Sequence, residues 1–159
     1  MGSQVSAIRL FIILTILLCV AVPARVCAAA SSEETILNDA ALAQLEARAQ
    51  SAQPREQCFL YAELVHNLTE VAGRELANGE DEQAGSTLRH INTLVQKIQT
   101  SIARDSKRLK NAELLMRHTT RRLMDMLHVA SNDDRPVLQA TLKRLDTVQS
   151  EMLTQVFVH

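Results

Sequence analysis

Cys58 is the first candidate for covalent chemistry in this chain, because a thiolate is both a nucleophile and a metal ligand. It lies outside the apolar N-terminal segment that holds Cys19 and Cys27, and no signature of a catalytic partner accompanies it. The sequence also lacks a Gly-x-Ser-x-Gly turn and a glycine-rich phosphate loop. We therefore expect Cys58 to be a buried small hydrophobe, with an intermolecular disulfide as the alternative, and we expect no catalytic residues and no enzyme.

Histidine and methionine are the second candidates, because a thioether and an imidazole together suit a soft metal such as copper. Met124 and His128 are one helical turn apart, and His118 lies nearby in the sequence. Met116 and Met126, however, fall on an apolar seam, where methionine is ordinary core filling. The chain has no His-x-x-x-His pair and no His–carboxylate cluster of recognisable spacing. We therefore expect no metal site, no cofactor and no small-molecule substrate.

Charge is distributed unevenly along the chain, although the formal net charge is only −1. Residues 33–82 hold eleven acidic and three basic side chains, whereas residues 89–122 hold nine basic and two acidic ones. The basic residues that avoid the apolar seam form a basic stripe, which comprises Arg104, Lys107, Arg108, Lys110, Arg117, Arg121 and Arg122.

This basic stripe suits an anionic partner such as a phospholipid surface, an envelope polymer or an acidic protein. The alternative is that Glu56, Glu63 and Glu70, spaced by sevens, neutralise it within the fold, or that it is a solvated face. Glu113 and Arg117 have the four-residue spacing of a stabilising pair inside the stripe. Nucleic acid is an unfavoured partner, because aromatic residues make up only 3% of the chain and leave little for base stacking.

The elements that must position these residues are predicted to be helices. After residue 30 the chain contains three glycines and two prolines, and no sustained alternation typical of strands. Pro54 suits the first turn of a helix, Asn78-Gly79 suits a C-terminal turn, and Pro136 suits the start of a last helix. These signals predict four helices in a single domain over 31–159, at about 33–52, 54–78, 81–130 and 135–157, the first preceded by a capping box at Ser31–Glu34.

The third of these helices is predicted from a seam of apolar residues spaced three and four apart from Leu88 to Ala130, with only Asp105 and Thr119 polar. One continuous helix over 81–130 predicts an all-α, elongated antiparallel bundle around a long central helix. Helix 54–78 would fold back along its first half and helix 135–157 along its second half. The alternative is a break near Ser101–Ser106 that gives a compact bundle.

Asp105 would then lie at the junction of the two flanking helices. It is expected to be solvated there or paired with Arg55 or Arg74, because an unpaired charge on a core seam is costly.

The N-terminal segment has the order of a secretory signal peptide. Residues 10–22 are free of charge, and small residues near Ala28–Ala30 offer a cleavage site. Thirteen apolar residues are also fewer than the roughly 20 that a membrane-spanning helix needs. We therefore expect residues 1–30 to be a signal and the protein to be periplasmic or secreted, with an uncleaved N-terminal anchor as the alternative.

The turn between 54–78 and the following helix resembles a tetratricopeptide helical hairpin over about residues 60–95. Ala72, Gly79, Ala84 and Leu88 match its small–glycine–alanine–large pattern, whereas Leu68 and Glu75 replace its aromatic positions. No second copy follows at a 34-residue period. The resemblance implies a helical-hairpin interaction fold and no binding residues.

Together these features predict an exported, non-enzymatic helical protein that binds other proteins or itself through helix faces. The alternative is a periplasmic chaperone or stress-sensing adaptor that presents the basic stripe to unfolded clients or to anionic envelope surfaces.

Overall fold

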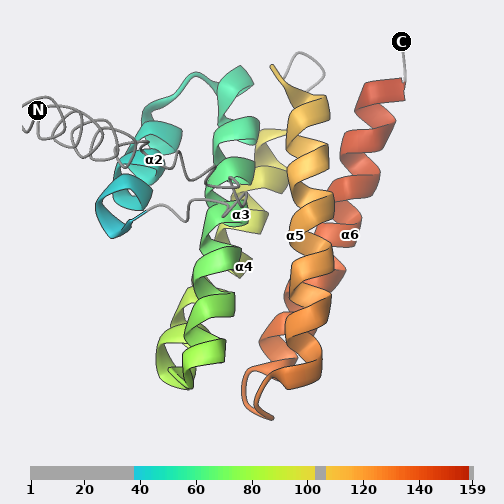
Figure 1. Ribbon diagram of the computed structural model, residues 1–159. Coiled ribbons are helices and arrows are strands. Elements are labelled where there is room, and N and C mark those ends of the chain that lie inside the picture. The colour runs from blue at the N-terminus through green and yellow to red at the C-terminus, as the bar shows by residue number, and fades with distance from the viewer. Residues whose placement is uncertain (1–37, 103–106, 158–159) are drawn as a thin grey trace, which may run out of the picture. The chain divides into compact units, whose positions relative to one another are not determined.

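The computed structural model describes residues 38–102 and 107–157, and every regular element in these two ranges is an α-helix. The helices are α2 Asp39–Ser51, α3 Pro54–Asn78, α4 Asp81–Ser101, α5 Leu109–Val129 and α6 Arg135–Phe157 (Figure 1). The expected all-helical bundle is therefore confirmed. The expected signal at 1–30 and the capping box at Ser31–Glu34 lie outside the described residues. None of the described helices has both the length and the apolar character that crossing a membrane requires.

The helix ends follow local chemistry. The side chain of Asn38 accepts a hydrogen bond of 2.9 Å from the Ala41 N–H and caps α2. Pro54 starts α3, and Gly79 ends it in the left-handed conformation with a φ of 76°. Before α6, the Ser131 hydroxyl accepts from the Asp134 N–H and donates to the Asp134 carboxylate, at 3.1 and 2.7 Å.

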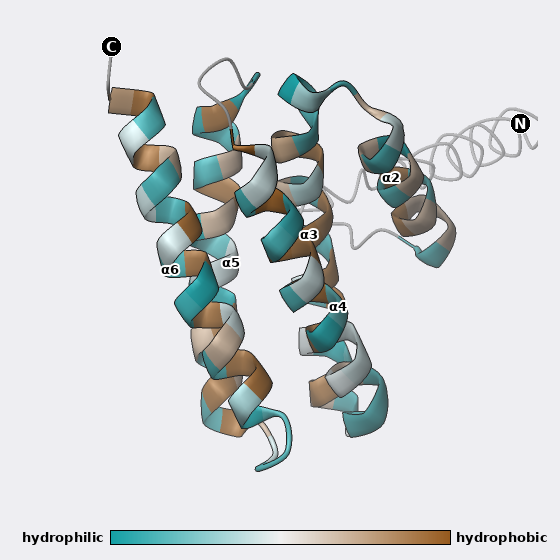
Figure 2. Cartoon of the chain, turned by 180° about the vertical axis from the view of Figure 1, so that it is seen from behind, coloured by the Kyte–Doolittle hydropathy of each residue, from teal (hydrophilic) through white to brown (hydrophobic). Residues whose placement is uncertain are grey.

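Helices α3 to α6 form a four-helix bundle, and α2 packs on the outside of α3 (Figure 1). Each of α3 and α6 packs against both α4 and α5, so α4 and α5 occupy opposite corners of the bundle. The chain therefore forms two helical hairpins, α3–α4 and α5–α6, that pack side by side. Hydrophobic and hydrophilic stretches alternate along each helix, as this packing of amphipathic helices requires (Figure 2).

The expectation of one continuous helix over 81–130 is wrong, because the structure has two helices there, α4 and α5. The helix α4 ends at Ser101, Ile102 is extended, and Arg108 has a left-handed backbone with a φ of 58° before α5 begins. The chain thus takes the compact arrangement that a break near Ser101–Ser106 allows. Asp105, with its expected partners, lies outside the described residues, so its environment stays a prediction.

Packing explains why the chain turns back. Five consecutive residues of α3, from Cys58 to Ala62, are all buried, which no single face of a helix can provide. They are buried because α3 is covered by α2, α4 and α5. A continuous helix would place α5 far from α3 and leave part of this apolar surface in water. The seam itself is confirmed on both helices, from Leu88 to Ile98 and from Leu109 to Ala130.

The left-handed conformation at Gly79 gives a direct test of the α3–α4 turn. Replacing Gly79→Ala should lower the free energy of unfolding by roughly 1–2 kcal/mol, because a Cβ disfavours a positive φ. Urea unfolding followed by circular dichroism measures the change. Gly79→Asn is the matched control and should cost less, since asparagine tolerates this conformation. Equal losses for the two variants would contradict a turn that depends on the backbone conformation.

Candidate functional site

The structure distributes the residues of the basic stripe over several environments instead of one continuous face. Arg104 lies outside the described residues. Lys107 and Arg108 lie at the end of the bundle where α3 and α5 both begin, and the other four lie on α5 (Figure 1). The contacts that each makes decide which of them remain available to a partner.

Lys107 and Arg108 contact residues in the first turns of α3. The Lys107 N–H donates a 2.7 Å hydrogen bond to the Arg55 carbonyl oxygen. The Lys107 ammonium lies 2.7 Å from a Glu56 carboxylate oxygen, and the Arg108 guanidinium stacks on Phe59 at 3.5 Å from the ring centroid. The left-handed backbone of Arg108 costs roughly 1–2 kcal/mol, and these contacts offset that cost.

The Lys107 ammonium holds the pKa of Glu56 below its usual value through a hydrogen bond and its charge, and Arg55 and Arg48 add to this effect. A carboxylate whose pKa is lowered in the folded state stabilises that state above its ordinary pKa and loses this contribution as the pH falls through the lowered value. The contact is exposed, so solvent screens it strongly. It fixes the position of residues 107–108 more than it stabilises the fold.

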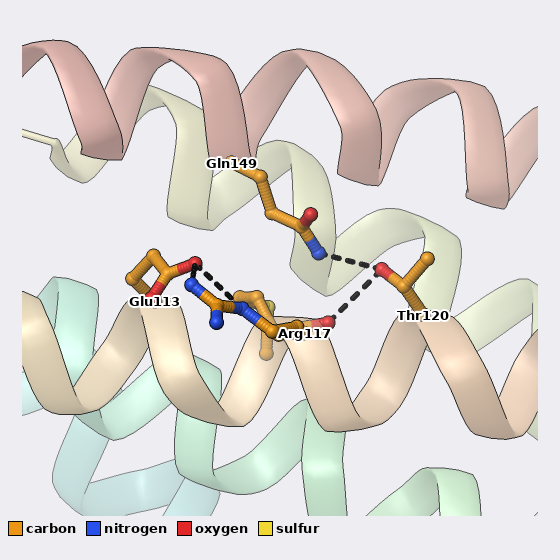
Figure 3. Close-up of polar contacts among 5 residues, drawn as sticks. Glu113, Arg117, Thr120 and Gln149 are labelled. Atoms are coloured by element: carbon orange, nitrogen blue, oxygen red, sulfur yellow. Dashed lines mark hydrogen bonds and ion pairs between the residues drawn. The ribbon is translucent and has the colours of Figure 1, made fainter.

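Two further cations of the stripe are paired. Arg122 reaches across to Glu70 on α3 at 3.2 Å, where Gly73 leaves room for the guanidinium. Arg117 lies 2.7 Å from Glu113 one turn earlier on α5, and the Glu113 side chain is only 11% exposed. Figure 3 shows this pair beside the contact of Thr120 on α5 with Gln149 on α6, at 2.6 Å. The expected Glu113–Arg117 pair and the neutralisation by Glu56 and Glu70 are thus present, whereas no contact joins Glu63 to the stripe among the described residues.

Lys110 and Arg121 differ from these cations, since within the described ranges neither forms an ion pair. Both are exposed, and they lie on the side of α5 that points away from the bundle. Leu114 and Met124 lie on the same side and are 50% and 54% exposed. We call these four residues, Lys110, Leu114, Arg121 and Met124, the outward face of α5.

Sequence reasoning identified the two cations of this face but not its two apolar residues. Leu114 lies two residues before Met116 on the apolar seam, and Met124 was considered only as a metal ligand. The signal that could have identified them is their position: both lie off the seam, where an apolar side chain on an amphipathic helix is unburied.

The metal and thiol candidates are also placed by the structure. His118 and His128 are exposed on α5 with Met124. In the part of the chain that is described, no three His, Cys, Asp or Glu side chains are grouped to hold a metal ion. Cys58 is fully buried, and burial raises the pKa of its thiol to about 11, partly offset by a hydrogen bond with Ser101.

Comparisons with known proteins do not assign the chain to a family. No family model matches the chain, and neither a curated protein nor a solved structure shows significant similarity to it. The residues of the tetratricopeptide resemblance lie in the antiparallel helices α3 and α4, and Ala72, Ala84 and Leu88 are buried.

Burial of Cys58 has a consequence for its reactivity. In the folded protein at pH 8, alkylation of Cys58 by iodoacetamide should be slower than in urea-unfolded protein by orders of magnitude, because the thiol is covered and largely protonated. Mass spectrometry over time measures the rates. Rapid alkylation of the folded protein, or a disulfide-linked dimer on a non-reducing gel, would contradict this placement and support the intermolecular thiol.

The paired and unpaired cations of α5 should differ in what they contribute to stability. Arg117→Ala should lower the free energy of unfolding by about 1 kcal/mol, because it leaves the largely buried Glu113 carboxylate without its cation. The matched control Arg121→Ala should stay within about 0.5 kcal/mol of the parent, since Arg121 forms no ion pair with any described residue. Urea unfolding measures both, and a larger loss for Arg121→Ala would reverse the assignment.

Proposed function

We propose that this chain is an exported, non-enzymatic protein-interaction module that binds an acidic partner protein through the outward face of α5. The observation that carries the proposal is the combination on one helix side of two unpaired cations with two exposed apolar side chains. Apolar contact supplies most of the affinity of a protein interface, and unpaired charges select the partner and its orientation.

The contrast with the rest of the basic stripe supports a specific surface over a general basic field. The side chains of this chain already provide a carboxylate partner for each of Lys107, Arg117 and Arg122. An acidic partner would therefore gain most at Lys110 and Arg121, which have no carboxylate to give up among the described residues. Lys110 and Arg121 are therefore the cations of the basic stripe on which the proposal rests.

The non-enzymatic part of the proposal is supported by the filling of the bundle. The described core consists mainly of aliphatic side chains of α3, α4, α5 and α6. Its buried polar residues are dispersed over three helices and one loop, and they comprise Thr69, Glu113, Thr119, Asp134 and Thr141. Catalysis needs titratable groups that converge on one reacting atom, and dispersed groups do not provide this.

Site-specific photo-crosslinking tests the proposal. A photoreactive amino acid at Leu114 in cells producing the full chain should give a discrete crosslinked protein partner. The double charge reversal Lys110→Glu and Arg121→Glu should remove that product while circular dichroism shows unchanged helix content. Reversal at Arg74 and Lys143, two exposed cations on α3 and α6, is the matched control with the same change in charge and should retain it.

Two outcomes would overturn the proposal. Retention of the crosslinked product after reversal of Lys110 and Arg121 would show that the face does not select the partner. Binding of the purified protein to phosphatidylglycerol vesicles through the same two residues, with no crosslinked protein, would favour the alternative function at an anionic envelope surface.

A further inference from the structure

A pocket lies at the end of the bundle where α2 ends and α3 and α5 begin. It has a volume of about 400 Å³, within the roughly 300–1,000 Å³ of small-molecule sites. Phe59, Leu60 and Ala52 provide apolar surface, and Phe59 and Leu60 are themselves almost fully buried in the core. The pocket is therefore partly built from rigid core side chains.

The charged residues around this pocket are unbalanced. Arg48, Lys107 and Arg108 line it together with a single carboxylate, Glu56. Glu56 is already engaged by the Lys107 ammonium at 2.7 Å. Among the described residues neither Arg48 nor Arg108 forms an ion pair, so two guanidinium groups border apolar surface beside a carboxylate, Glu56, that already contacts Lys107.

The orientation of Arg108 suits an anion. Its guanidinium lies over the Phe59 ring at 3.5 Å from the centroid. Stacking uses the face of the guanidinium and leaves the N–H groups at its edge free to donate. Such an edge binds a carboxylate or a phosphate through two parallel hydrogen bonds. The contacts of Lys107 with Arg55 and Glu56 hold the neighbouring backbone in place, so this arrangement exists before any ligand binds.

We propose that this pocket binds a small amphiphilic anion, with its carboxylate or phosphate on Arg48 and Arg108 and its apolar part against Phe59 and Leu60. This ligand differs from the sequence-based expectation of no small-molecule substrate, because α2, α3 and residues 107–108 meet only in the fold. The pocket shares no residue with the outward face of α5, so this inference and the proposed function can fail independently.

Isothermal titration calorimetry of the full chain with octanoate and octyl phosphate tests the proposal. Both should bind, whereas octylammonium should not, and octanol should bind at least about tenfold more weakly because it lacks the charge-assisted hydrogen bonds. Tighter binding of one of the two anions identifies the head group. Inorganic phosphate alone should bind weakly, since it leaves the apolar surface uncovered.

Substitutions of the pocket residues test whether octanoate binds in this pocket. Arg48→Gln and Arg108→Gln should each weaken octanoate binding about tenfold, and Arg74→Gln, at an exposed cation near the other end of α3, should leave it unchanged. Ala52→Leu should weaken it by filling the pocket without changing charge, and circular dichroism should show intact helices in every variant. The proposal is overturned if neither anion binds at millimolar concentration, if octanol binds as tightly as octanoate, or if Arg74→Gln weakens binding as much as Arg48→Gln.

Discussion

The structure depends on the return of the chain between α4 and α5. The Lys107 N–H donates to the Arg55 carbonyl at 2.7 Å, and its ammonium contacts Glu56, so α5 begins beside the first turn of α3. From that point α5 runs alongside α3, and Arg122 meets Glu70 further along the same pair of helices. A seam of apolar residues that suits one long helix is thereby divided between two corners of one bundle. Both halves of the seam bury against the same core.

The return of the chain between α4 and α5 also determines which charged side chains form ion pairs. The acidic residues of α3 and the basic residues of α5 are about fifty positions apart in sequence, and folding places them side by side. Lys107 and Arg122 of the basic stripe are consequently paired with carboxylates of α3, and Arg117 is paired within α5. The cations of the stripe that have no carboxylate partner among the described residues lie in two places. One is the outward face of α5, and the other is the pocket bordered by Arg48 and Arg108. The proposed protein partner would bind at the first of these places, and the proposed small anion at the second.

Much of the fold was predictable because local signals set the helix boundaries. Pro54, Gly79 and Pro136 act through their own backbones, so α3 and α6 begin and end where the sequence predicted. The break after Ser101 was not the preferred interpretation, because heptad spacing continues through it and neither glycine nor proline marks it. What favours the break is tertiary: the consecutive buried residues Cys58 to Ala62 need a neighbour on another side of α3.

The candidate sites were predictable only in part, because they too depend on how the helices pack. Sequence indicated which residues are basic, and the Glu113–Arg117 pair followed from helical spacing alone. Whether a cation is paired depends on residues from another helix, as for Lys107 and Arg122. The exposure of Leu114 and Met124 and the stacking of Arg108 on Phe59 depend on how helices pack, and single-sequence patterns contain no information on that arrangement.

The distance between the start of α4 and the end of α5 shows whether α5 folds back beside α3. Spin labels are introduced through Glu82→Cys and Val129→Cys, two exposed positions, in a chain in which Cys19, Cys27 and Cys58 are replaced by alanine. Their separation is measured by pulsed electron resonance. The separation should be under about 30 Å, because α4 and α5 lie at opposite corners of a bundle whose neighbouring helices are roughly 10 Å apart, and the labels add their own length. A separation near 70 Å, as a continuous helix with about 1.5 Å per residue would give, would contradict it.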